Sequence, residues 1–257
     1  MERLKLTAIV LRTVDYGESD KVVTLLSRER GKVSAFARGA RASRRRFGGA
    51  LEPFTLVVAE ARVRPGSELL GLESVSVERG FGAIRADLAR IACASYAAEL
   101  ARELVRDHEP HDDLFELLAV YLALLDVAPA HPAALRAFEL GALRAAGLMP
   151  RLDGCARCGG ELARDARAIR FDPGQGGALC PACGEAAAPG TPALSQAAAA
   201  ALLRLQVGGL AAAEAEALPP PSGREARDAL CAFLEYHLGR RLASRRFLDE
   251  VGPMLGE

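Results

Sequence analysis

The stretch Val22-Val-Thr-Leu-Leu-Ser-Arg-Glu-Arg-Gly-Lys-Val-Ser-Ala-Phe36 decides how the first part of the chain folds. Two runs of aliphatic and β-branched residues, 22–26 and 32–36, flank the polar segment Arg28-Glu-Arg-Gly31. Apolar runs on both sides of a glycine-containing turn are typical of a β-hairpin. We therefore expect two antiparallel strands here.

The neighbouring segments extend this β pattern in both directions. Residues 4–12 alternate, with Leu6, Ala8 and Val10 on one face, and residues 54–59 form a buried type of run. The turn Pro65-Gly-Ser67 precedes a further strand at 69–77. Five short strands separated by turns predict a small closed barrel of OB type over residues 1–80. An SH3-like barrel or an open sheet gives the same pattern, so both stay open as alternatives.

From Phe81 onward the apolar residues recur at helical spacing. A first helical segment is predicted to follow Phe81. Further helices are predicted over residues 114–125, 132–146, 195–206 and 224–248. The predicted fold class is therefore α+β, with an N-terminal β-barrel followed by an all-helical domain over residues 81–257. A cysteine-containing insert at 151–185 interrupts that domain.

This insert holds two CxxC pairs, Cys155-Ala-Arg-Cys158 and Cys180-Pro-Ala-Cys183, separated by 21 residues. Two CxxC turns at such a separation predict one structural Zn²⁺ held by four thiolates. Four protein ligands leave no open position for water, which argues against a catalytic metal. Redox pairs or disulfides are the alternative, but a redox CxxC normally lies alone beside a βαβ unit, and none is predicted here.

Charge is distributed unevenly along a chain whose formal net charge is zero. Residues 1–80 carry a net charge of +5 and residues 81–257 a net charge of −5. Five arginines fall within nine residues between the third and fourth predicted strands: Arg38, Arg41, Arg44, Arg45 and Arg46. Guanidinium groups bind phosphate in a bidentate manner, so we expect this loop, with Arg12 and Lys32 as neighbours, to bind nucleic acid. A simple solvated loop is the alternative.

The sequence offers no catalytic set. It contains no Walker A loop, no GxSxG elbow and no HExxH, and its four histidines are scattered. We therefore predict a protein that is not an enzyme. The first residues lack the apolar core of a signal peptide and no run is long enough to span a membrane, so a cytoplasmic location without membrane contact is expected.

Several ordered segments resemble the RecO family of bacterial DNA repair proteins. In the first domain they are Ala8-Ile-Val-Leu-Arg12, Tyr16-Gly-Glu-Ser-Asp20, Gly31-Lys-Val, Ala37-Arg-Gly-Ala-Arg41 and Leu51-Glu-Pro-Phe54. In the helical domain they are Tyr96-Ala-Ala-Glu-Leu100, Leu114-Phe-Glu-Leu-Leu118 and the tail from Leu238 to Leu248. Each segment alone is weak, but the ordered set runs nearly end to end.

The resemblance implies a non-enzymatic recombination mediator for DNA repair. Such a protein binds single- and double-stranded DNA, anneals complementary strands and, together with RecR, helps to load RecA onto DNA coated with single-strand-binding protein. It also implies nucleoid association and contact with the C-terminal tail of that protein. We expect an apolar groove in the helical domain to take this acidic, hydrophobic tail, with Arg240, Arg241, Arg245 and Arg246 as carboxylate partners. A solvated helix face is the alternative for these arginines.

Two other classes of function remain open at this stage. A zinc-ribbon protein that binds RNA or acts in transcription also combines a barrel with a ribbon. A metal-dependent hydrolase would need an open metal position, which four thiolates do not provide.

Overall fold

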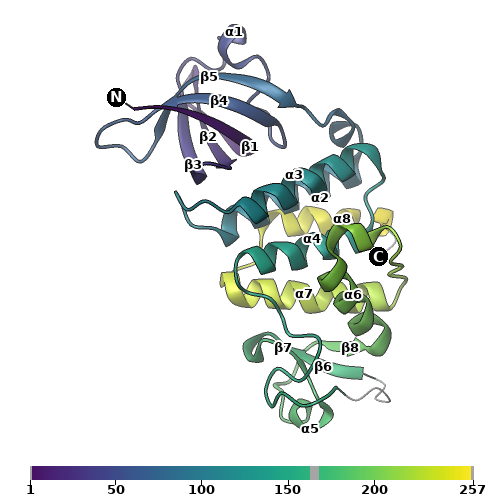
Figure 1. Cartoon of the computed structure of the whole chain (residues 1–257). Coiled ribbons are helices and arrows are strands. Elements are labelled where there is room, and N and C mark those ends of the chain that lie inside the picture. Colours follow the sequence, from purple (N-terminus) through teal and green to yellow (C-terminus); the bar gives the residue numbers. More distant parts are fainter. Residues whose placement is uncertain (1, 163–167, 256–257) are drawn as a thin grey trace. The chain divides into compact units, whose positions relative to one another are not determined.

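The computed structural model describes residues 2–162 and 168–255, without the side chains of Arg44, Ala168 and residues 253–255. It divides into unit 1, Met1–Ala128, and unit 2, Pro129–Glu257. Unit 1 contains the barrel and two long helices, and unit 2 contains a small sheet and the helices from Pro132 onward (Figure 1). Both CxxC pairs lie in unit 2, whereas Cys93 lies in unit 1.

Unit 1 begins with a closed five-stranded barrel in the order β1-β2-β3-β5-β4. All pairs are antiparallel except a short parallel contact between β3 and β5, which closes the barrel. This order and the helical turn after the third strand are those of the predicted OB-type barrel, so the predicted fold class is confirmed. The elements are β1 Arg3–Tyr16, β2 Asp20–Ser27, β3 Gly31–Ala37, α1 Arg44–Phe47, β4 Leu56–Arg62 and β5 Leu70–Arg79.

Side chains that alternate along the strands fill the barrel, with one register shift in β1 between Val10 and Arg12. Leu6, Ala8 and Val10 point inward as predicted and are at most 1% exposed. Residues of the other strands that complete this core are Val23, Leu25, Val33, Ala35, Val57, Ala59, Leu70 and Leu72. Because side chains alternate across a strand, the residues between them face outward. On this outer face Ile9 and Leu26 are buried, whereas Arg12, Val14 and Tyr16 are exposed.

Helices α2 and α3 complete unit 1. The elements after the barrel are the short 3₁₀ helix η1 Gly82–Ala86, α2 Leu88–Leu104 and α3 Asp112–Val127. The loop between α2 and α3 lies against the start of β3, where the His108 N–H donates to the Lys32 carbonyl at 2.8 Å. The opposite end of β3 leads toward α1, at the end of the barrel away from α2 and α3 (Figure 1).

Unit 2 packs a small sheet against helices. Its helices are α4 Pro132–Ala145, α5 Pro181–Gly184, α6 Gln196–Ala213, α7 Ser222–Leu238 and α8 Ala243–Leu255, and η2 Pro173–Gln175 is a 3₁₀ turn. The sheet has the order β7-β6-β8, from Gly177–Leu179, Ala168–Asp172 and Ala193–Ser195. Phe171 of β6 contacts Phe233 of α7, with ring centroids 5.8 Å apart. The sequence analysis did not predict this sheet.

The predicted single helix over 224–248 is wrong. The structure has two helices, α7 and α8, because Gly239 adopts a left-handed conformation with φ of 68° and ends α7. Left-handed glycine is the commonest way for a helix to stop. The break leaves Arg240 and Arg241 in the turn and places Arg245 and Arg246 on the separate helix α8.

We expect Gly31→Ala to destabilise unit 1. Gly31 has φ of 63°, and a Cβ there would overlap the Glu109 backbone carbonyl. The left-handed conformation and the steric overlap together should lower the free energy of unfolding by about 2–4 kcal/mol. Gly66→Ala is the matched control: φ is 73° but nothing lies within 4 Å of its Cβ, so only about 1–2 kcal/mol is expected. Urea denaturation followed by circular dichroism measures both, and equal losses would contradict the steric argument.

Candidate nucleic-acid interface and metal centre

The two CxxC pairs form tight turns that strand β7 holds side by side. In the first turn the Gly159 N–H donates to the Cys155 carbonyl at 2.9 Å, and in the second the Gly184 N–H donates to the Cys180 carbonyl at 2.8 Å. Cys180 directly follows β7, and the Ala156 N–H donates to Ala178 of β7 at 2.7 Å. Pairing to one strand therefore brings together two segments that are far apart in sequence.

The four sulfurs gather as a metal site requires. All four Sγ atoms of Cys155, Cys158, Cys180 and Cys183 lie within 4.8 Å of one another, and the Cys158–Cys180 separation is 3.8 Å. Four thiolates at about 2.3 Å from a tetrahedral ion would lie about 3.8 Å apart. The donor set and its spacing therefore fit a metal ion with four sulfur ligands and no open position.

The electrostatics of the cluster also fit a cation. Burial disfavours the Cys155 thiolate, but backbone N–H groups of Cys158, Cys180 and Arg157 donate to it and lower its pKa to about 6. Hydrogen bonding to Cys180, together with burial, raises the pKa of Cys183 to about 12. The Cys155 thiolate thus forms easily while Cys183 keeps its proton, and a bound divalent cation would replace that proton.

The arginine-rich loop, residues 38–46, leads from β3 into α1. Arg38, Arg41, Arg45 and Arg46 are exposed, and the side chain of Arg44 lies outside the described part of the chain. Phe47 is only 2% exposed and belongs to the barrel core. Cation–π contact with Phe47, at 5.0 Å from the ring centroid, keeps Arg46 close to the barrel.

Specific hydrogen bonds fasten this loop to the turn between β1 and β2. Asp20 Oδ1 accepts from the Gly39 N–H at 2.7 Å, and the Arg41 N–H donates to the Ser19 carbonyl at 3.0 Å. Arg46 closes the loop on itself by donating to the Arg38 carbonyl at 2.8 Å. The arginines are therefore displayed from a fixed backbone, so fewer conformations are lost when a ligand binds.

The hydrogen bond from Gly39 holds the pKa of Asp20 below its ordinary value, and the Lys21 ammonium does the same for the pKa of Asp15. Asp15 and Asp20 are thus ionised and engaged by donors at neutral pH, whereas Glu18 of the turn itself is exposed. Asp15 lies 2.9 Å from Lys21 Nζ. Attraction to Arg38 also lowers the pKa of Asp20, and attraction to Arg41 lowers the pKa of Asp15, so these arginines and carboxylates partly offset each other's charge.

The two other residues predicted for this surface lie in different places. Arg12 is exposed on the outer face of β1, opposite Thr24 of β2. Lys32 lies at the start of β3, where its Nζ donates to the Arg102 carbonyl at 2.9 Å and lies 3.2 Å from Asp107. Five residues of the strand lie between Lys32 and Arg38, so six steps of about 3.3 Å put them about 20 Å apart. The structure therefore brings Arg12 toward the β1–β2–β3 face and places Lys32 at the other end of the barrel.

Arg64 belongs to the same region of the barrel and was not singled out from the sequence. Its guanidinium lies 5.8 Å from the centroid of the Phe36 ring. It follows β4 in the connection to β5, one of the loops with which OB folds bind oligonucleotides. The position of Arg64 between the fourth and fifth predicted strands could have identified it from the sequence.

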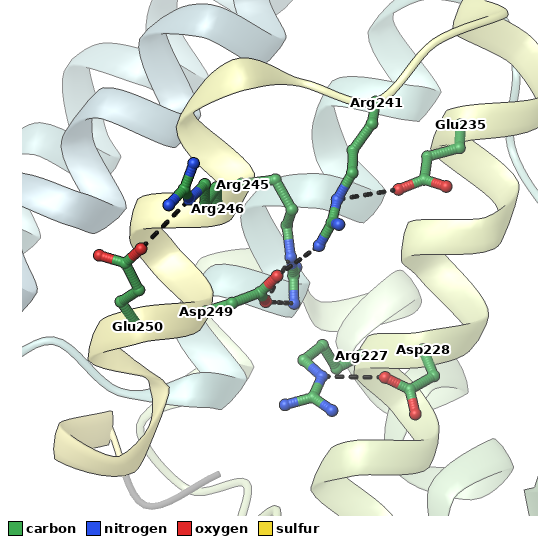
Figure 2. Close-up of polar contacts among 8 residues, drawn as sticks. All are labelled: Arg227, Asp228, Glu235, Arg241, Arg245, Arg246, Asp249 and Glu250. Atoms are coloured by element: carbon green, nitrogen blue, oxygen red, sulfur yellow. Dashed lines mark hydrogen bonds and ion pairs between the residues drawn. The ribbon is translucent and has the colours of Figure 1, made fainter.

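Most of the arginines predicted to bind an acidic tail are engaged by carboxylates of unit 2. Figure 2 shows Arg241 and Arg245 converging on Asp249, while Arg246 points to Glu250. Arg245 is only 5% exposed, whereas the Arg246 side chain is 87% exposed. Arg240 is exposed in the turn between α7 and α8. An incoming carboxylate would have to displace Asp249 or Glu250 to reach Arg241, Arg245 or Arg246.

Comparison with known proteins matches both parts of the chain to one family. The family model "Recombination protein O N terminal" matches residues 1–81, and "Recombination protein O C terminal" matches residues 85–246. The chain belongs to the RecO family. Proteins named "DNA repair protein RecO" are 75% identical over 256 residues in Anaeromyxobacter sp. (strain Fw109-5), covering 100% of this chain and 99% of the relative, and 48% identical over 252 residues in Myxococcus xanthus, covering 98% and 99%. In Geobacter sulfurreducens the identity is 41% over 254 residues, with 98% and 100% covered.

Membership of the RecO family confirms the resemblance and assigns the chain to DNA repair and recombination. The alternative of an RNA-binding or transcription-associated protein is correspondingly disfavoured. Within residues 2–162 and 168–255, no helix combines the length and the apolar character needed to cross a membrane.

The hydrogen bond between Asp20 and Gly39 predicts a pH dependence of the arginine-rich loop in this RecO-family chain. Because the pKa of Asp20 is lowered in the folded state, the bond is complete above the ordinary value of 3.8 and is lost as the pH falls through the lower folded value. An NMR titration of the Gly39 amide proton should show a midpoint below 3.8. The Asp20→Asn variant should lose this transition. A midpoint at or above the ordinary value would contradict the assignment.

Proposed function

We propose that this RecO-family chain is a non-enzymatic recombination mediator that binds single- and double-stranded DNA and anneals complementary strands. The observation that carries the proposal is the set of exposed arginines on a loop fastened to an OB-type barrel. Residues 1–80 would supply the DNA-binding domain and residues 81–257 the helical domain with its metal module at 151–185.

Annealing sets a physical requirement that such a surface meets. Two polyanions must approach each other, so the protein has to screen phosphate repulsion without covering the Watson–Crick edges. Arginines that contact phosphates release counterions and carry no base specificity. If Arg38, Arg41, Arg44, Arg45 and Arg46 neutralise about five phosphates, the logarithm of the affinity for single strands should fall with the logarithm of salt at a slope of about −3.5.

The proposal extends to partners and location. We propose that the chain works in the bacterial cytoplasm, associated with the nucleoid, and acts with RecR to help RecA onto DNA coated with single-strand-binding protein. Arg240, Arg241, Arg245 and Arg246 are proposed to receive the acidic tail of that protein. The contacts of Asp249 and Glu250 require that this binding proceed by exchange of one carboxylate for another.

We also propose that the four cysteines hold one Zn²⁺. Cys155, Cys158, Cys180 and Cys183 would each supply a thiolate, and the ion would crosslink the two turns to β7. Its contribution is structural, because a strand of three residues has too little apolar surface to hold the module together alone.

Neutralising the loop arginines should flatten the salt dependence of DNA binding. In the triple variant Arg38→Gln, Arg41→Gln and Arg45→Gln, the slope for a single-stranded oligonucleotide should become shallower by about 2, at about 0.7 for each lost phosphate contact. Fluorescence anisotropy at several salt concentrations measures the slope. The rate of annealing of complementary oligonucleotides, with and without single-strand-binding protein, should fall in parallel.

A second triple variant separates this surface from overall charge. Arg106→Gln, Arg157→Gln and Arg224→Gln remove three exposed arginines elsewhere in the chain. We expect this variant to keep the slope and the annealing rate of the parent. The DNA surface is misplaced if both variants change the slope equally, and the proposed function fails if the parent does not anneal strands.

Metal analysis should find about one zinc per chain. Cys158→Ser should abolish this content, because Cys158 is a proposed ligand whose exposed position leaves no core cavity when it is replaced. Chelation should expose four additional thiols to a thiol reagent. Cys93→Ala, which alters a buried cysteine outside the cluster, should keep one zinc. Retention of zinc by Cys158→Ser would show that the ion binds elsewhere.

A further inference from the structure

An exposed apolar patch lies on the outer face of the barrel. Val14 of β1 pairs with Val22 of β2, and Val22 pairs with Phe36 of β3, so the three side chains form a row across three strands. Val14 is 43% exposed, and Tyr16, two residues further along β1, is 61% exposed. The neighbouring inward residues fill the core, so the fold itself does not require these outward side chains to be apolar.

The rings of this patch are arranged in a defined way. Tyr16 meets Phe36 edge to face, with centroids 5.7 Å apart and an interplanar angle of 81°. Arg64 lies over the Phe36 ring at 5.8 Å. Gly71, the β5 residue that pairs with Phe36, makes room for the Arg64 side chain, because a Cβ there would lie 3.3 Å from Arg64 Cδ. Phe36 is thus held between its two neighbours while Tyr16 remains largely open to solvent.

Basic residues border the patch, and of the acidic residues near Tyr16, Asp15 is paired with Lys21, Asp20 accepts from the Gly39 N–H, and Glu18 is exposed. Arg38 follows Phe36 after one residue, and Arg12 lies on the same outer face of β1 as Val14 and Tyr16. The Ser19 carbonyl and the Asp20 carboxylate, just beyond Tyr16, hold the arginine-rich loop. A ligand that fills this surface must therefore combine flat apolar groups with a chain of negative charges.

We propose that Tyr16 and Phe36, with Arg64 behind Phe36, form a stacking platform for an unpaired base of single-stranded DNA. The inference rests on the proposed DNA binding. It adds that this part of the surface binds single-stranded DNA in preference to a duplex. An unpaired base has a free face that stacks on an aromatic ring, whereas the bases of a duplex cover each other. The exposed arginines beside the platform bind the phosphates of the same strand.

Charge and stacking make different contributions, which allows them to be separated. Phosphate contacts act on single strands and duplexes alike and are weakened by salt. A stacking contact is uncharged, so its loss lowers the affinity for single strands without changing the slope of the salt dependence. The platform therefore gives this chain a preference for single strands, while the arginine-rich loop provides binding to both forms.

The experiment measures the affinity of Tyr16→Ala for three probes: oligo-dT, an abasic oligonucleotide of the same length and a duplex. Loss of one stacked base should weaken binding of oligo-dT by about 5- to 150-fold. Binding of the abasic strand and of the duplex should change by less than about twofold, since neither offers a free base face. Tyr236→Ala is the matched control, because Tyr236 is 60% exposed and lies in unit 2.

Tyrosine emission supplies an independent readout. The chain has four tyrosines and no tryptophan, and Tyr96 and Tyr121 are buried, so quenching by DNA reports mainly on exposed rings. Oligo-dT should quench the parent protein. Tyr16→Phe should bind oligo-dT as the parent does but lose most of the quenching.

The outcomes separate this inference from the proposed function. A parent protein that binds none of the probes defeats the proposed function itself. A parent that binds oligo-dT while Tyr16→Ala binds it equally well overturns only the platform, and assigns the apolar patch to another kind of partner. Equal quenching in the parent and in Tyr16→Phe also overturns it. Circular dichroism confirms that each variant is folded.

Discussion

The short parallel contact between β3 and β5 is the constraint on which the first unit depends. Only two residue pairs, Ala35 with Leu70 and Phe36 with Gly71, join these strands, yet they close the barrel and remove its free edges. Closure of the barrel determines which residues are neighbours on its outer surface. It places Phe36 of β3 next to the β4–β5 connection with Arg64, and it directs the chain after Ala37 into the arginine-rich loop.

The two ends of β3 consequently have different roles. At its start, Lys32 and the loop between α2 and α3 are joined by hydrogen bonds and an ion pair, which bind the helices to the barrel. At its far end, the backbone of the arginine-rich loop is held by Ser19 and Asp20, while the side chains of Arg38, Arg41, Arg45 and Arg46 are exposed. Basic residues of the same strand and loop thus serve packing at one end and solvent-facing charge at the other. The positive charge of a residue in the sequence therefore does not show whether it packs against the helices or faces solvent.

Features with a strict spacing could be predicted from the sequence, and features set by contacts could not. The CxxC spacing predicted the cysteine cluster because two tight turns with thiols leave few arrangements other than a shared site. Alternation predicted the inward faces of the strands. By contrast, the strands of β6, β7 and β8 are short and lack a clear period, so the sheet was not anticipated. Gly239 looked like an isolated glycine within a helical pattern, and its left-handed backbone is a local choice that periodicity does not reveal.

The roles of the charged residues were still harder to predict from the sequence. Arg241 and Arg245 were predicted to be carboxylate partners of an acidic tail. Asp249 lies one helical turn after Arg245 in α8 and also meets Arg241 of the preceding turn. An arginine is available to a ligand only if its own chain has not already supplied the carboxylate, and that depends on helix geometry. The arginine-rich loop satisfies the condition better: no acidic residue lies within residues 38–46, and the nearby Asp20 carboxylate accepts from a backbone N–H. The exposed side chains of Arg38, Arg41 and Arg45 therefore lie near the aromatic patch, where the proposed single strand would meet both.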